Sequence, residues 1–148
     1  MGRPRGDRKK EHYYRFAKKQ GYRSRSAFKL KQIARQHRLL HGVKSVLELC
    51  CSPGGWTQVL VELDRTLQIT AVDLNPMQPV EGARFIQGDI TSPETIDEIV
   101  RVTGGLVDLV IADCSPKVSG YWEVDVARQL FLVESTMGLA MKLLSSHG

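Results

Sequence analysis

The sequence predicts an α/β fold with a doubly wound, mostly parallel sheet, and three observations support this. Short apolar runs alternate with longer amphipathic stretches from residue 46 to residue 144. A Pro-Gly-Gly turn at 53–55 joins the first apolar run to helix-forming sequence. Acids stand at or just beyond the ends of three later apolar runs, at Asp73, Asp89 and Asp113. Strands that alternate with helices are joined by right-handed crossovers, which make the strands parallel.

The composition is that of one soluble globular domain, with 148 residues, 42% hydrophobic and 25% charged. No apolar run approaches the roughly 20 residues that cross a bilayer, and no apolar segment follows the basic N-terminus, so we expect neither a membrane span nor a secretory signal. Three cysteines, two of them adjacent, make a poor disulfide framework and indicate a reducing, cytoplasmic compartment. Because no CxxC or paired-histidine spacing occurs, we expect no metal site.

Charge is distributed very unevenly along the chain. Residues 1–38 hold 14 Lys or Arg against 2 acids, whereas residues 39–148 hold 7 against 14. This basic N-terminal arm favours contact with a polyanion. A solvated surface helix that happens to be basic would show the same pattern.

Within the N-terminal arm, the sequence predicts a loose tail over residues 1–10 and a helix from about Glu11 to Gly21. Aromatic residues lie among its cations and could stack on bases or pack the helix onto the domain: Tyr13, Tyr14 and Phe16. A second helix follows, with Ser24 or Ser26 as its cap. Its predicted buried face is Ala27, Leu30, Ile33, Ala34 and His37. Lys29 lies at the edge of that face, and by pattern alone it is one cation among many.

Beyond the glycine turn, periodicity predicts the remaining elements. They are a helix at 56–63, strands at 68–72 and 84–87, a helix from Ser92-Pro93 to about 102, a strand at 106–112 and a helix at 125–144. The strand at 106–112 is apolar on both faces, as in the interior of a parallel sheet.

Several side chains at the carboxyl ends of these strands predict a ligand site. Gly54 and Gly55 would let a ligand approach the backbone, and Glu48 lies nearby. Asp73 is placed to accept hydrogen bonds from ribose hydroxyls, while Asp89 could accept from an adenine amino group and Ile90 could contact the ring. Each feature alone could be an ordinary turn or helix cap.

Together, the three acids beside a glycine turn indicate a nucleoside-binding crevice. The turn lacks the G-x-G-x-x-G of dinucleotide sites and the Lys-Ser/Thr of a phosphate-binding loop. S-adenosylmethionine, which carries no phosphate, fits that absence.

Five motifs resemble those of the FtsJ/RrmJ family of S-adenosylmethionine-dependent RNA 2′-O-methyltransferases, in its archaeal form: GYRSRSAFKL at 21–30, SPGGW at 52–56, AVDLNPM at 71–77, QGDIT at 87–91 and DCSPKVSG at 113–120. The resemblance covers nearly the whole chain. It implies a Rossmann-like methyltransferase fold whose first four strands lie in the order 3-2-1-4. It also implies an RNA-facing arm at 1–40 and a partial methyltransferase domain at 41–148.

The resemblance also implies roles for individual residues. Lys29 and Asp113 match the first two members of a catalytic Lys-Asp-Lys-Glu tetrad. The cofactor contacts it implies, with their neighbours in the same motifs, are Pro53, Gly54, Gly55, Trp56, Asp73, Leu74, Asp89, Ile90 and Asp113. Phosphate-facing cations are expected at Lys18, Lys19, Arg23 and Arg25.

The chain departs from the family pattern in two ways. Glu48-Leu49-Cys50 replaces an Asp-Leu-Gly, which predicts reduced cofactor affinity. The chain also stops before the second lysine and the glutamate, so we expect a C-terminally truncated protein that binds cofactor and RNA weakly and turns over slowly or not at all.

The substrate implied by the resemblance is a uridine of large-subunit ribosomal RNA, in the cytoplasm or, in a eukaryote, the nucleolus. A tRNA anticodon loop remains an alternative within the enzyme class. A noncatalytic RNA-binding or scaffold relative is the second hypothesis, and an oxidoreductase is disfavoured by the glycine pattern and the basic arm.

Overall fold

The computed structural model describes residues 5–148, with side chains from Lys9 onward, and its sheet is four-stranded and parallel in the order β3-β2-β1-β4. The fold class and strand order predicted from the sequence are therefore confirmed. In chain order the elements are α1 (Arg5–Lys19), α2 (Ala27–His37), β1 (Ser45–Leu49), α3 (Gly55–Leu63), β2 (Gln68–Asp73), β3 (Ala83–Gln87), α4 (Pro93–Thr103), β4 (Leu109–Ala112) and α5 (Trp122–Leu143).

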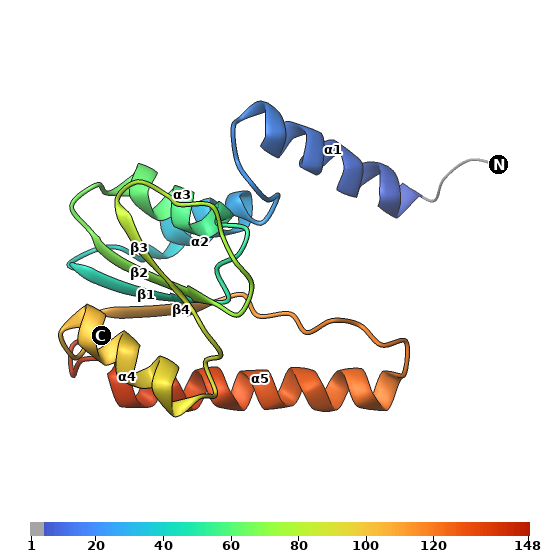
Figure 1. The fold of residues 1–148 in the computed structure, drawn as a ribbon. Helices are drawn as coiled ribbons and strands as arrows, with labels where there is room; N and C mark the ends of the chain where they lie inside the picture. The colour runs from blue at the N-terminus through green and yellow to red at the C-terminus, as the bar shows by residue number, and fades with distance from the viewer. Residues whose placement is uncertain (1–4) are drawn as a thin grey trace.

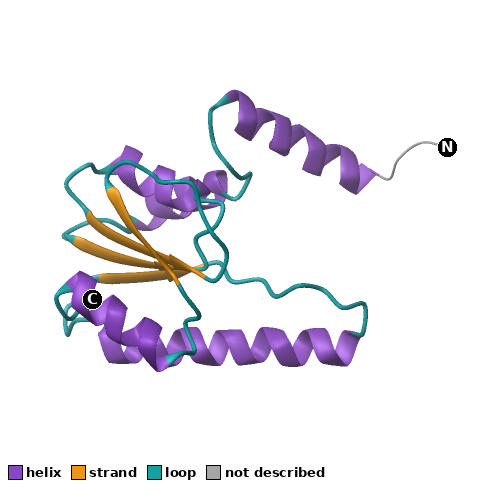
Figure 2. Ribbon diagram, in the orientation of Figure 1, coloured by secondary structure: helices purple, strands orange, loops and turns teal. Residues whose placement is uncertain are grey.

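The sheet lies between two helical layers (Figure 1). Helices α2 and α3 cover one face, whereas α4 and α5 lie against the other, and α1 extends away from the sheet. Figure 2 shows the four strands fanning between these layers, with a long loop running from the carboxyl end of β4 to α5. Among the described residues no helix is long and apolar enough to cross a membrane.

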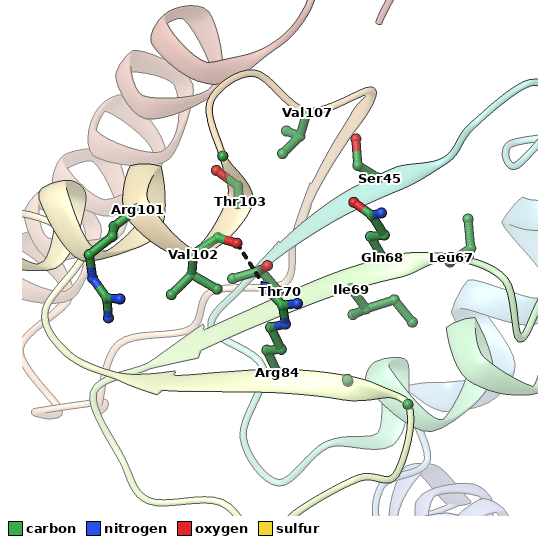
Figure 3. A pocket seen from close by; sticks show the side chains of 13 residues that line it. Ser45, Leu67, Gln68, Ile69, Thr70, Arg84, Arg101, Val102, Thr103 and Val107 are labelled. Carbon is green, nitrogen blue, oxygen red and sulfur yellow. Dashed lines mark hydrogen bonds between the residues drawn. The ribbon is translucent and has the colours of Figure 1, made fainter.

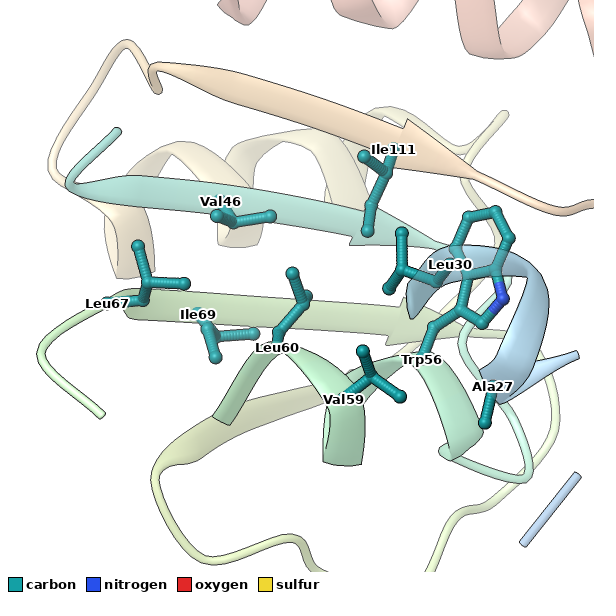
Figure 4. Close-up of a cluster of buried hydrophobic side chains, with 9 residues drawn as sticks. All are labelled: Ala27, Leu30, Val46, Trp56, Val59, Leu60, Leu67, Ile69 and Ile111. Atoms are coloured by element: carbon teal, nitrogen blue, oxygen red, sulfur yellow. The ribbon is translucent and has the colours of Figure 1, made fainter. Parts of the chain in front are cut away.

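Each face of the sheet has its own hydrophobic core, because side chains alternate along every strand. On the α2/α3 side, Val46 of β1 packs with residues of both helices (Figure 4). The nine buried members of this cluster are Ala27, Leu30, Val46, Trp56, Val59, Leu60, Leu67, Ile69 and Ile111. On the α4/α5 side, Leu47 and Leu49 pack against residues that include Ile99, Leu139 and Leu143.

The strand register brings the carboxyl ends of three strands to one level. Leu49 of β1 is paired with Val72 of β2 and with Ala112 of β4. The residues that follow these positions, Cys50, Asp73 and Asp113, therefore lie at the same edge of the sheet. This edge carries the candidate site.

Three predicted boundaries are wrong. Helix α1 begins at Arg5, so the predicted tail is helical from there on, while residues 1–4 lie outside the described part. Strand β4 begins at Leu109 instead of 106, because Val107 pairs with the end of α5: its N–H donates to Leu143 O at 2.8 Å and its carbonyl accepts from Ser145 N at 2.8 Å. Helix α5 begins at Trp122, three residues before the predicted start.

The predicted buried face of α2 is partly correct. Ala27 and Leu30 are fully buried, but His37 is exposed in the last turn. Arg38 ends the helix in a left-handed conformation with φ of 49°. Ser26 occupies the N-cap position without capping, because its hydroxyl lies 2.8 Å from Ser24 Oγ instead of bonding a helix amide.

Candidate functional site

The glycine turn between β1 and α3 is packed more tightly than the sequence suggests. Gly54 has a φ of 111°, a left-handed conformation that favours glycine. A Cβ at Gly55 would lie 2.1 Å from Ser24 Oγ. The missing side chain at 55 therefore makes room for the segment before α2, in addition to any ligand.

Arg23 holds this turn against a distant loop. Its guanidinium NH1 donates to Pro53 O at 3.1 Å and to Gln78 O at 2.5 Å, and NH2 donates to Pro79 O at 2.8 Å. Its backbone N–H donates to Gln58 at 2.9 Å. Sequence reasoning missed this role, because nothing in the pattern separates Arg23 from the other cations of the arm. Its predicted contact with RNA stays a prediction.

The structure brings the three predicted acids together. Asp73, Asp89 and Asp113 line one cavity of about 500 Å³ at the carboxyl edge of the sheet. Leu74 and Ile90, which were also predicted, line it too.

The two acids expected to hold an adenosine differ in environment. Asp73 is 8% exposed, and its two oxygens accept from the N–H groups of Ser52 and Asn75, both at 2.8 Å. Asp89 is exposed; its Oδ1 accepts from the hydroxyl of Thr91 at 2.6 Å and from its N–H at 2.8 Å. These bonds from Thr91 hold the pKa of Asp89 below its usual value. The structure shows no partner for Asp89 Oδ2 within its described residues.

Lys29 and Asp113 meet at the rim of the cavity. Lys29 Nζ lies 3.3 Å from Asp113 Oδ1 and 5.8 Å from the centre of the Trp56 ring. The Trp56 ring is 8% exposed, and its indole N–H donates to Ser26 O at 2.8 Å. Asp113 also lines a smaller cavity of about 50 Å³, together with Pro53, Gly55 and Trp56.

Glu48 lies in the wall of this smaller cavity and is 2% exposed. Its Oε2 accepts a 2.6 Å hydrogen bond from Thr57 Oγ1 on α3. Burial raises the pKa of Glu48 to about 7, the carboxylate of Asp73 adds to this, and the Thr57 bond opposes it. This carboxyl group was not among the predicted site residues, although the sequence showed that it lies near the carboxyl end of an apolar strand.

The cysteines correct a further expectation. Cys50 and Cys114 form a disulfide with a Cα–Cα distance of 5.1 Å, whereas the sequence was interpreted as a poor disulfide framework. The bonded residues are 64 apart in sequence, and only the parallel pairing of β1 with β4 brings them together. Cys51 is free and buried.

The basic arm presents both aromatic and cationic side chains. Tyr13, Tyr14 and Phe16 are 54%, 49% and 43% exposed. Lys18 Nζ lies 5.1 Å from the ring centre of Tyr14. Phe16 also stacks on Phe28 of α2, with ring centres 5.2 Å apart, and Ala17 is buried, so these two residues hold α1 while its other rings are exposed. The other predicted RNA-facing cations, Lys19 and Arg25, are exposed.

A second cavity, of about 550 Å³, lies at the opposite end of the sheet (Figure 3). It is lined by the amino ends of β2 and β3 and by the last turn of α4, where Arg84 donates to Val102 O at 3.0 Å. Ligands of open α/β sheets bind at the carboxyl edge, so this cavity is not the candidate site. Within the described range there is no cluster of three or more residues that could hold a metal ion.

Comparison with known proteins decides the family. The sequence profile of the FtsJ-like methyltransferases matches residues 22–148. The chain belongs to the FtsJ-like methyltransferase family.

Relatives within this family are named for RNA methylation. Ribosomal RNA large subunit methyltransferase E of Methanothrix thermoacetophila is 45% identical over 139 residues, which are 94% of this chain and 54% of that protein. The protein of the same name from Archaeoglobus fulgidus is 42% identical over 95% of this chain and 72% of its own length. A relative from Dictyostelium discoideum, 41% identical over the whole chain and 57% of its own length, is named for tRNA 2′-O-methylation. The chain thus spans about half the length of several relatives that it matches.

A solved structure of another protein supports the fold. A crystal structure of a ribosomal RNA methyltransferase from Plasmodium falciparum matches with a TM-score of 0.72 at 26% identity. The match covers 84% of this chain and 73% of that one.

The first departure from the family pattern consists of Glu48, which lies in β1, and Cys50, which directly follows it. At Cys50, where the pattern has glycine, φ is 61°, a left-handed conformation that glycine adopts without strain. Glu48 places a longer acid than aspartate beneath the smaller cavity.

Proposed function

We propose that this chain binds S-adenosylmethionine at the carboxyl edge of its sheet and serves the transfer of a methyl group to a ribose 2′-hydroxyl of RNA. The observation that carries the proposal is the convergence of Asp73, Asp89 and Asp113 on one cavity beside the glycine turn. Membership of the FtsJ-like family supports the same chemistry.

The cavity has the hydrogen-bond acceptors and the apolar wall that an adenosine needs. Asp73 already accepts two backbone N–H groups, which fix its carboxylate, and each oxygen keeps a lone pair for a ribose hydroxyl. Asp89 Oδ2 is available to an adenine amino group, and Ile90, 8% exposed, offers an apolar contact to the ring. When bound, S-adenosylmethionine supplies a methyl group on a positively charged sulfur.

Lys29 and Asp113 are suited to orient the ribose. Asp113 Oδ1 is paired with Lys29 Nζ at 3.3 Å, which leaves Oδ2 to accept a hydrogen bond from the 2′-hydroxyl. The ammonium of Lys29 can donate to the same hydroxyl oxygen. Holding the oxygen in line with the methyl group at roughly 3 Å is a large part of what such a transfer requires.

The arm supplies the RNA contacts. Phosphates would be met by Lys18, Lys19 and Arg25, and unpaired bases would stack on Tyr13 and Tyr14. Because phosphate contacts carry no sequence information, they do not select the RNA.

For the substrate we propose a uridine of large-subunit ribosomal RNA, in the cytoplasm or the nucleolus, since several relatives are named for the large subunit. A tRNA is the second candidate, favoured by the Dictyostelium relative that matches the whole chain.

Calorimetric titration with S-adenosylhomocysteine tests the cofactor site. We expect binding by the native chain and at least about tenfold weaker binding by Asp73→Asn and by Asp89→Asn, since a charged hydrogen bond contributes about 1.5–3 kcal/mol. Asp97→Ala, an exposed acid on α4 away from the cavity, is the matched control and keeps the native affinity. Absence of binding at millimolar ligand would favour a noncatalytic scaffold.

The RNA side is tested separately. The chain is incubated with labelled S-adenosylmethionine and either large-subunit rRNA or tRNA, and the products are digested and analysed for 2′-O-methylated nucleotides by mass spectrometry. Methylation of rRNA in preference to tRNA supports the main proposal, and the reverse preference supports the second candidate. Methylation of a base instead of a ribose would refute both.

A further inference from the structure

The Cys50–Cys114 disulfide joins the ends of two neighbouring strands at the candidate site. Cys50 directly follows β1, and Cys114 directly follows Asp113 at the end of β4. Because Leu49 is paired with Ala112, the two strands deliver both cysteines to the same level of the sheet.

One end of this bond lines the site, and the other end, Cys114, lies between residues that line it. Cys50 lines the small cavity beside Glu48 and also the large cavity beside Asp73, so it stands where the two meet. Residues 113 and 115–117 form one wall of the large cavity. From this wall the chain runs as a long loop to α5, seen in orange in Figure 1.

Few other contacts hold the wall. Two residues of α5 donate to backbone carbonyls of the wall: Gln129 to Cys114 O at 3.3 Å and Arg128 to Lys117 O at 3.5 Å. Lys29 pairs with Asp113 at 3.3 Å through two exposed side chains, and Cys114 packs against the core on the α4/α5 side. Across the described residues, the disulfide is the one covalent link between this wall and β1.

We propose that Cys50 and Cys114 are a reversible oxidation site, and that the disulfide raises the affinity for S-adenosylmethionine by holding the 113–117 wall against β1. The inference rests on the proposed function, because it concerns the regulation of that site. With the wall already held, binding no longer has to order it, and less free energy is lost on association.

The chemistry is thiol–disulfide exchange with a low-molecular-weight disulfide such as glutathione disulfide. The thiolate of one cysteine attacks the reagent, forms a mixed disulfide and releases one thiolate. The second cysteine, as its thiolate, attacks the mixed disulfide and releases the second. Two protein thiols thus lose two electrons and two protons, and the reagent becomes two thiols.

The third cysteine is protected from this exchange. Cys51 is 4% exposed, while Cys50 and Cys114 are both partly exposed. Burial, with the charges of Glu48 and Asp73 nearby, raises the pKa of the Cys51 thiol, so little of it is present as reactive thiolate. Exchange is therefore selective for the pair.

The test compares the oxidised and reduced 148-residue chain. Samples treated with glutathione disulfide or with a phosphine reductant are unfolded, alkylated with N-ethylmaleimide and weighed by mass spectrometry, which we expect to show one and three adducts respectively. The same samples are titrated with S-adenosylhomocysteine, and we expect about tenfold tighter binding by the oxidised form. Amide exchange over residues 113–121 is expected to be slower in the oxidised form.

Two variants serve as controls. Cys114→Ser is expected to bind with the affinity of the reduced form under either treatment, whereas Cys51→Ala keeps the response to oxidation. Equal affinities of the two native forms, or three adducts after oxidation, would overturn the inference. Absence of binding in both forms would overturn the proposed function, and the adduct count and amide exchange would still report on the disulfide.

Discussion

Lys29 Nζ lies 3.3 Å from Asp113 Oδ1, although 84 residues separate the two in sequence. The pair forms because α2 packs over the carboxyl ends of β1 and β4, and it is 60% and 42% exposed. Such exposure means that solvent screens the attraction, so the pair contributes little to stability.

Removal of Lys29 is therefore expected to leave stability almost unchanged. Lys29→Ala lowers the free energy of unfolding by less than about 0.5 kcal/mol, because exposed ion pairs contribute little. Lys31→Ala is the matched comparison on the same helix: Lys31 is 21% exposed, pairs with Glu62 at 2.8 Å and lies 4.8 Å from the ring centre of Tyr22. We expect a loss of about 1 kcal/mol there. Urea unfolding followed by Trp56 fluorescence, in a Trp122→Phe background, measures both, and equal losses would contradict this assignment.

Glu48 predicts an unusual dependence of stability on pH. Its pKa is raised to about 7 in the folded chain, so between pH 4.5 and 7 the folded state holds more protons than the unfolded state. Stability from this group is therefore present at low pH and is lost as the pH rises through 7, by up to about 3 kcal/mol. Glu48→Gln removes this slope. Urea unfolding at several pH values from 5 to 8 checks it, and parallel curves for both proteins would contradict it.

Substitution by alanine is expected to have opposite effects on stability at Gly55 and at Gly138. A Cβ at Gly55 would lie 2.1 Å from Ser24 Oγ, so Gly55→Ala displaces the segment before α2 and costs about 1–3 kcal/mol. Gly138 lies inside α5 with nothing within 4 Å of a new Cβ. Gly138→Ala should stabilise the helix by up to about 1 kcal/mol. Thermal unfolding followed by circular dichroism distinguishes the two, and a neutral Gly55→Ala would show that Ser24 moves freely.

Arg23 and Arg25 are two cations with different expected effects. Arg23→Ala breaks three hydrogen bonds to the carbonyls of Pro53, Gln78 and Pro79, and we expect a loss of about 1–3 kcal/mol. Arg25→Ala, at an exposed position, is expected to leave stability within about 0.5 kcal/mol while weakening RNA binding and reducing its salt dependence. Urea unfolding and fluorescence anisotropy with labelled RNA measure the two effects. If Arg23→Ala left the stability unchanged, this would contradict a structural role for Arg23.

The sequence predicted those parts of the molecule that depend on local pattern. Strand periodicity and the acids at strand ends predicted the sheet. The pair Ser92-Pro93 predicted the start of α4, where Ser92 Oγ accepts a hydrogen bond from Thr95 N at 3.3 Å. The family resemblance supplied Lys29, whose own spacing carried no signal.

Contacts between distant segments escaped prediction. The start of β4 depends on Val107, which pairs with the end of α5: its N–H donates to Leu143 O and its carbonyl accepts from Ser145 N, both at 2.8 Å. The disulfide depends on strand order, which places Cys50 beside Cys114. Neither arrangement produces a periodic pattern in the sequence.

Helix α5 is about 33 Å long, yet the structure buries only its final turns, through Leu139 and Leu143. Leu130, Phe131 and Met137 are each more than half exposed. Its earlier turns therefore unwind at little energetic cost. Ellipticity is expected to fall at a lower urea concentration than the emission of Trp56, measured in a Trp122→Phe background, and the two curves will not superimpose. A two-state model of unfolding will then apply to the sheet but not to the whole chain.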